Sequence, residues 1–237
     1  TAFVTIDNVE RLQALAEKLQ IDVRIRNIDD PADAGSIFPD ALPVLNIPLP
    51  HAPTPGTPTP DTAPAVIASI ETAVRLALEG HVAGIVTNPI QKHTLYAAGF
   101  TRPGHTEFLA DLSNSPNPPV MMLACHGLRV VPVTIHVGLR RALDLLSTEL
   151  IVEQTRLTHQ ALITDFGISA PSIAIAGLNP HAGESGAMGD EEATIITPAI
   201  ELLRADGVNV TGPEPPDTLF TETKRNTYDA AICTYHD

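Results

Sequence analysis

The stretch PSIAIAGLNP, residues 171–180, carries the clearest fold signal in the chain. It is a continuous apolar run that ends in a Gly-Leu-Asn-Pro turn, which predicts a buried strand. The following segment, DEEATIITPAIELLRADG at residues 190–207, predicts a helix. A strand that is apolar throughout and is followed by a helix is typical of the mainly parallel sheets of α/β proteins.

The same alternation of apolar runs and helical patterns extends along the rest of the chain. Further strands are expected at 2–7, 23–28, 42–49, 82–89, 120–125, 129–136 and 228–237. Further helices are expected at 9–19, 65–80, 90–99, 137–147 and 148–167, with a loop that runs into a helix at 100–113. Asn8 is a candidate cap for the first helix, Gly80 is a candidate stop for the second, and the proline-rich stretch 48–64 predicts a surface loop. These patterns predict an α/β protein whose mainly parallel or mixed sheets are flanked by helices.

The composition of the chain excludes some kinds of binding partner, namely nucleic acids and membranes. The chain has 237 residues, of which 43% are hydrophobic, and a formal net charge of −14. Such a chain can bury a sizeable core, but it lacks the basic surface that nucleic acids require. Cys125 and Cys233 lie in apolar runs, so we expect buried thiols and no disulfide framework. No apolar run approaches the roughly 20 residues of a membrane span and no signal-peptide pattern is visible, so we expect a cytoplasmic protein without a membrane partner.

Three of the nine histidines follow predicted strands. His136 ends the run at 129–136, His181 comes directly after 171–180, and His236 lies near the end of 228–237. Sites in open α/β sheets gather at the carboxyl ends of strands, and three imidazoles there suit a divalent transition metal. A single histidine at a strand end is more often an ordinary polar residue, and spacing alone does not show that the three converge.

The segment RPGHTEFLA, residues 102–110, places His105 and Thr106 at the start of an expected helix. Helix N-termini attract anions, so this pair is a candidate for binding phosphate or carboxylate. The simpler interpretation is a capping turn, with Thr106 as the cap and Glu107 as a first-turn acid. Lys92 is a second candidate anion contact, although a lysine on a helix face is most often solvated.

Other polar residues have simpler interpretations. The acidic run 190–192 favours the first turn of a helix, and Asp237 is a candidate partner of His236. Among the remaining histidines, we expect His51 and His81 to be solvated and His159 to lie on the surface or between helices, whereas His93 and His126 stay ambiguous.

Five further patterns are GHTEFLA at 104–110, IHVGLR at 135–140, GLNPHAGESGAMGDEE at 177–192, PDTLF at 216–220 and YHD at 235–237. Together these segments resemble the 4-hydroxythreonine-4-phosphate dehydrogenase family of pyridoxal 5′-phosphate (vitamin B6) biosynthesis. The resemblance covers essentially the whole chain. It implies a two-domain α/β/α architecture similar to that of isocitrate and isopropylmalate dehydrogenases. The first domain would span 1–99, and the second, carrying the metal and substrate motifs, would span 100–237.

The resemblance also implies the site. His136, His181 and His236 match the family's ligands for a divalent metal (zinc, magnesium or cobalt), and His105 with Thr106 matches its substrate-binding pair. NAD or NADP is the implied cofactor, and the implied assembly is a homodimer whose active site lies at the subunit interface. No residue is assigned here as the catalytic acid or base or as a cofactor contact, and no G-x-G-x-x-G fingerprint is present.

The implied reaction is the oxidation of 4-phosphooxy-L-threonine to 2-amino-3-oxo-4-phosphooxybutanoate, which then loses CO₂ to give 3-amino-2-oxopropyl phosphate. Relatives that oxidise threonate or erythronate 4-phosphates, or cyclic dihydrodiol carboxylates, share the same motifs, so these substrates stay open. The family's glycine-rich opening and its continuation beyond YHD are not in this sequence. We therefore expect a fragment that lacks both family termini and is inactive by itself. A non-catalytic metal-binding or interaction protein is the alternative of a different class.

Overall fold

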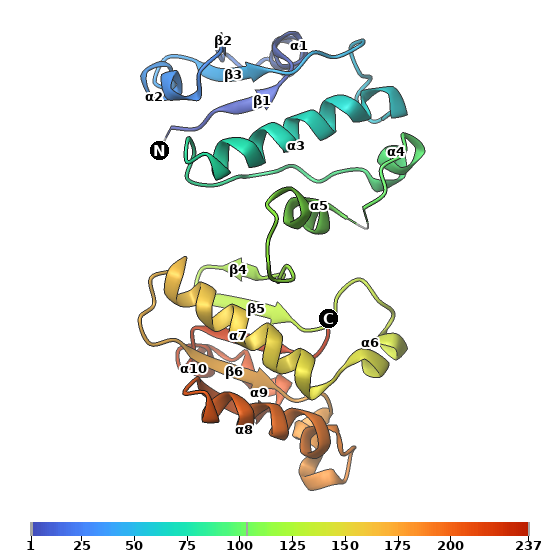
Figure 1. The fold of residues 1–237 in the computed structure, drawn as a ribbon, viewed down its shortest axis with the longest axis vertical. Helices are drawn as coiled ribbons and strands as arrows, with labels where there is room; N and C mark the ends of the chain where they lie inside the picture. Colours follow the sequence, from blue (N-terminus) through green and yellow to red (C-terminus); the bar gives the residue numbers. More distant parts are fainter. Residues whose placement is uncertain (1, 103, 237) are drawn as a thin grey trace. The chain divides into compact units, whose positions relative to one another are not determined.

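The computed structural model describes residues 2–102 and 104–236 and divides into two compact units, residues 1–119 and 120–237 (Figure 1). Both units contain parallel strands flanked by helices, which confirms the predicted α/β class. None of the helices in the described ranges is long and apolar enough to cross a membrane.

The first unit is built on a small parallel sheet with strand order β1-β3-β2. Its strands are β1 (Thr5–Asp7), β2 (Ile25–Ile28) and β3 (Leu42–Asn46). Its helices are α1 (Val9–Leu19), α2 (Ala34–Ile37), α3 (Ala63–Leu78), α4 (Lys92–Ala97) and α5 (His105–Leu112), with 3-10 turns at Pro31–Asp33 and Pro60–Thr62. The expected helix signals are confirmed: the Asn8 side chain caps α1 by accepting from the Arg11 amide at 2.9 Å, and Gly80 follows α3 with φ 76°.

The strand predicted at 82–89 is wrong. This segment has no regular secondary structure, and the Val86 side chain is fully exposed. Its apolar character has another cause, because Ile85 packs against the buried cluster of Ile70, Val74 and Phe108. Among the described residues no strand pairs with 82–89, and an extended segment needs such a neighbour to satisfy its backbone.

The division between the units falls later in the chain than the boundary expected after residue 99. Phe108 of α5 packs with Ile70 and Val74 of α3, so α5 shares the apolar core of the first unit. The division consequently follows Pro119.

The second unit contains a mixed sheet with strand order β4-β5-β8-β6-β7. The strands are β4 (Leu123–Cys125), β5 (Leu128–Pro132), β6 (Ser172–Ala176), β7 (Asn209–Glu214) and β8 (Ala230–Cys233). Only the pairing of β4 with β5 is antiparallel. In the parallel part, Val131 pairs with Ile232 and Ile175 pairs with the same Ile232, so β5, β8 and β6 run side by side in register.

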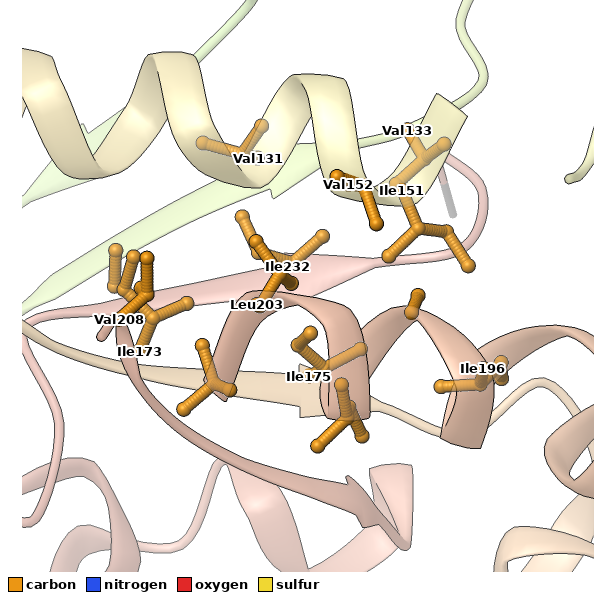
Figure 2. Packing of buried hydrophobic residues seen from close by; sticks show 14 of the residues in the cluster. Val131, Val133, Ile151, Val152, Ile173, Ile175, Ile196, Leu203, Val208 and Ile232 are labelled. Carbon is orange, nitrogen blue, oxygen red and sulfur yellow. The ribbon is translucent and has the colours of Figure 1, made fainter. Parts of the chain in front are cut away.

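Helices cover both faces of this sheet, as the uninterrupted apolar run at 172–176 predicts. The helices are α6 (Leu139–Leu145), α7 (Thr148–Thr164), α8 (Thr197–Ala205), α9 (Pro216–Leu219) and α10 (Glu222–Arg225), with a π-helical turn at Glu192–Ile196 and a 3-10 segment at Pro180–Gly186. Ile173 and Ile175 face α7 and α8 in the main core (Figure 2). Ala174 and Ala176 face the other way and pack with Leu219 of α9.

Two further expectations for the second unit need correction. The helix predicted at 190–207 begins as a π-helical turn before α8, and β7 with the short helices after it was not predicted.

Cys125 is exposed rather than buried, because β4 is a short edge strand whose residues all face solvent. Cys233 is partly buried, and burial raises the pKa of its thiol to about 11.

Candidate functional site

His136, His181 and His236 lie beyond the carboxyl ends of three neighbouring parallel strands. They follow β5, β6 and β8 respectively, and β8 lies between the other two. Because the parallel strands are in register, their carboxyl ends meet at one edge of the sheet, where such folds place ligand sites. The side chains of all three histidines are exposed. The predicted placement at one sheet edge is thus present.

The imidazoles do not converge on one point within a single chain. Among residues 2–102 and 104–236, no group of three or more His, Cys, Asp or Glu side chains is placed to hold a metal ion. Asp237, the candidate partner of His236, lies outside the described residues. The chemistry of the donor set still fits a divalent transition metal, because exposed imidazole nitrogens are common ligands of zinc and cobalt.

Two of these histidines have unusual backbone conformations. His136 has φ 55° and His181 has φ 52°, both in the left-handed region that non-glycine residues seldom occupy. The segment from His181 to Ser185 is left-handed at every residue, with φ values of 52°, 53°, 76°, 43° and 59°, and only the third is glycine. Such a conformation costs about 1–2 kcal/mol for each non-glycine residue, so the surrounding structure must hold it.

Asp217 is a neighbour of His181 that the sequence did not single out. Its Oδ2 atom lies 3.8 Å from Nδ1 of His181, and both side chains are largely exposed. This separation is too long for a hydrogen bond, so Asp217 does not determine which imidazole nitrogen of His181 would face a ligand. The signal in the sequence was the PDTLF segment, which begins α9 next to the His181 turn.

His105 and Thr106 begin α5 in the first unit. The residue that caps this helix is Gly104, so the interpretation of Thr106 as the cap is wrong. Thr106 is exposed, whereas Nε2 of His105 is buried and has no hydrogen-bond partner among the described residues. Burial lowers the pKa of His105, so its imidazole is neutral near pH 7.

Lys92 is exposed, as expected of a lysine on a helix face, and its side chain also reaches this helix start. A Cβ atom on Gly104 would lie 3.2 Å from Nζ of Lys92 and 2.8 Å from Oε2 of Glu107. Both charged groups therefore approach the Gly104 backbone, next to His105. A side chain at position 104 would displace the ends of these two flexible side chains, and the arrangement puts an ammonium group near the N-terminus of α5.

The remaining histidines belong neither to the three candidate metal ligands nor to the start of α5. His51 is exposed and pairs with Asp61, and this hydrogen bond raises the pKa of His51. His81 lies 3.5 Å from the Glu79 carboxylate and is exposed. His93 and His126 are exposed, and His159 is half-buried on α7.

Comparisons with known proteins agree with the resemblance. The family model described as "Pyridoxal phosphate biosynthetic protein PdxA" matches residues 1–237. A 4-hydroxythreonine-4-phosphate dehydrogenase of Caulobacter vibrioides is 52% identical over 220 residues, which are 91% of this chain and 66% of the relative. One of Maricaulis maris is 53% identical over 205 residues, which are 84% of this chain and 60% of the relative. The chain thus spans somewhat less than two thirds of the length of these relatives.

Solved structures give the same result. A crystal structure of 4-hydroxythreonine-4-phosphate dehydrogenase from Klebsiella pneumoniae matches with a TM-score of 0.89 at 37% identity, over 99% of this chain and 71% of the other. A terephthalate 1,2-cis-dihydrodiol dehydrogenase from Burkholderia xenovorans matches with a TM-score of 0.60 at 26% identity, over 99% of this chain and 80% of the other. The chain belongs to the family of the pyridoxal phosphate biosynthetic protein PdxA.

Proposed function

We propose that this chain forms the metal- and substrate-binding part of a 4-hydroxythreonine-4-phosphate dehydrogenase. The enzyme would oxidise 4-phosphooxy-L-threonine with NAD or NADP and would act in the cytoplasm in pyridoxal 5′-phosphate biosynthesis. The observation that carries the proposal is the position of three histidines beyond the carboxyl ends of the adjacent parallel strands β5, β8 and β6. Family membership over residues 1–237 supports it.

The metal ligands in this proposal are His136, His181 and His236. All three side chains are exposed at the edge of the sheet, so a second subunit can approach them. We therefore propose a homodimer in which His136 and His181 of one subunit combine with the His236 supplied by the other. Imidazole ligands favour zinc or cobalt over magnesium, which prefers oxygen.

The substrate contacts in this proposal are His105, Thr106 and Lys92. The α5 N-terminus and the Lys92 ammonium together favour an anionic group such as the phosphate. Nε2 of the neutral His105 imidazole has no hydrogen-bond partner in the described part of the chain, so it could donate to or accept from a substrate atom according to its tautomer. These residues would orient the substrate.

The proposed reaction has two steps. A bound NAD or NADP would accept a hydride from the hydroxyl-bearing carbon while a base accepts the hydroxyl proton, and the resulting β-keto acid would lose CO₂ and be protonated at the α-carbon. His136, His181 and His236 would hold the metal, which would supply Lewis acidity to the substrate oxygen. His105, Thr106 and Lys92 would hold the phosphate and so orient the substrate for hydride transfer.

Replacement of His181 tests the metal role. In the protein at the full length of its relatives, we expect His181→Ala to lose bound metal and to lower kcat/KM by about 100-fold or more. His126→Ala, in the exposed turn between β4 and β5, is the matched control and should change neither quantity. Unchanged metal content and activity in His181→Ala would refute the proposal.

Phosphate dependence separates the possible substrates. The similarity to a terephthalate dihydrodiol dehydrogenase keeps a phosphate-free substrate class as the second candidate. NADH formation should be observed with 4-phosphooxy-L-threonine and should be lost with the same compound lacking phosphate. Equal turnover of both compounds would favour the second candidate.

A further inference from the structure

We propose that Glu192 is the positioning residue for His181, holding the strained turn from which the imidazole projects. The inference rests on the proposed function, because it concerns a ligand of the proposed metal. Glu192 would act through His181 and not by contact with the reacting groups. It fixes the backbone that leads into His181.

The Glu192 carboxylate binds the chain immediately before the turn. Oε1 accepts hydrogen bonds from the backbone amides of Leu178 at 2.8 Å and Asn179 at 2.7 Å. Oε2 accepts a third, at 2.9 Å, from the side-chain amide of Asn179. Both oxygens are therefore occupied by the two residues that connect the end of β6 to Pro180 and His181.

The same carboxylate also packs against the inside of the turn. A Cβ atom on Gly183 would lie 2.6 Å from Oε2, and one on Gly177 would lie 3.1 Å from Oε1. Gly183 has φ 76° and is the middle residue of the left-handed run. Glu192 thus contacts the chain before and within the turn, so the conformation of residues 181–185 depends on where this carboxylate sits.

Burial and charge set Glu192 apart from an ordinary helix-start acid. The residue as a whole is only 6% exposed. Burial acts to raise the pKa of Glu192, but hydrogen bonds from Asn179 and Leu178 outweigh burial and leave the pKa below its usual value. A buried carboxylate that stays charged needs donors, and among the described residues these are the backbone of Glu192 itself together with Leu178 and Asn179 at the end of the strand before His181.

Glu191 provides an internal control. Its Oε2 atom also accepts from the side-chain amide of Asn179, at 2.7 Å, but makes none of the bonds to the backbone of Leu178 and Asn179. The same Glu→Gln change at 191 and 192 therefore removes the same charge from neighbouring positions, and only at 192 does it replace a charged acceptor of backbone amides with a weaker, neutral one.

The first measurement is hydrogen exchange on the metal-free, full-length protein. We expect Glu192→Gln to speed exchange of amides in 177–186 by about tenfold while other segments and the unfolding midpoint stay near those of wild type. Glu191→Gln should leave exchange in that segment unchanged. Uniformly faster exchange throughout the second unit, or no change in 177–186, would overturn the inference.

The second measurement is the affinity for Zn²⁺, determined by competition with a chelator. We expect Glu192→Gln to weaken binding by about 10–100-fold, the range typical of residues that orient metal ligands, and Glu191→Gln to bind as wild type does. Should Glu192→Gln fail to fold, Glu192→Asp replaces it, because the shorter side chain keeps the charge but withdraws from both amides. Wild-type affinity and exchange in the replacement would equally overturn the inference.

The His181→Ala variant distinguishes failure of the proposed metal role from failure of the proposed positioning role of Glu192. If that variant binds Zn²⁺ as wild type does, the proposed metal role fails, while exchange of the metal-free Glu192→Gln protein still decides whether Glu192 holds the turn. If His181→Ala loses Zn²⁺ affinity and Glu192→Gln does not, the inference fails and the proposed function stands.

Discussion

At the scale of single residues, local contacts shift the pKa values of two histidines of the first unit in opposite directions. Burial lowers the pKa of His105 from 6.5, whereas the hydrogen bond with Asp61 raises that of the exposed His51. We expect NMR titration of the imidazole protons to place His105 below His51. His105→Gln identifies the first resonance, and a pKa of His105 at or above that of His51 would contradict the expectation.

The lowered pKa of His105 has a definite sign for stability. The unfolded chain takes up the proton at higher pH than the folded one, so protonation favours unfolding. The contribution of the neutral imidazole is complete above pH 6.5 and is lost as the pH falls toward the lower pKa of the folded state. Denaturant titrations across this interval should show that His105→Gln reduces the acid-induced loss of stability, and an unchanged dependence would count against this sign.

At the scale of elements, the strand β6 links the core to the His181 turn. Ile175 is fully buried between α7 and α8, and we expect Ile175→Ala to lower the free energy of unfolding by about 2–5 kcal/mol. The chain has no tryptophan, so far-UV circular dichroism in urea is the suitable probe. Leu202→Ala on the exposed side of α8 is the control and should change stability by less than about 0.5 kcal/mol. Equal effects of the two substitutions would contradict this view of the core.

The elements also show what a sequence can specify. The buried strand at β6 was predictable because an apolar run between helical patterns requires cover on both faces. The run at 82–89 looked the same, yet Ile85 packs on a helix and no neighbouring strand is present among the described residues. Periodicity reports that residues are buried, but it does not report which partner buries them.

Of the candidate site, too, one part could be predicted from the sequence and another part could not. The edge location of His136, His181 and His236 was predictable, because each follows a strand and parallel strands end together. The part played by Glu192 was not, because an acid at a helix start already has a local explanation. Its actual partners, Leu178 and Asn179, lie across the turn, and only the folded chain brings them to its carboxylate.

At the scale of the whole molecule, the question is whether one chain can complete the metal site. Within the described residues the three histidines share a sheet edge without forming a metal-binding group. In the proposed homodimer, each metal site would contain His136 and His181 from one subunit and His236 from the other. A symmetric dimer would then contain two such sites, each dependent on both chains.

This arrangement makes a prediction that a single-chain site does not. Co-expressed His136→Ala and His236→Ala proteins at full length should form mixed dimers in which one site has lost both ligands and the other is intact. Since about half of randomly assembled dimers are mixed, about a quarter of wild-type activity and metal content should return, although each variant alone is inactive. Co-expression of His136→Ala with His181→Ala is the matched control, because both ligands come from the same subunit and every site stays damaged. Recovery in neither pair would mean that each chain supplies all three ligands itself, and recovery in both pairs would mean that His136 and His181 belong to different subunits.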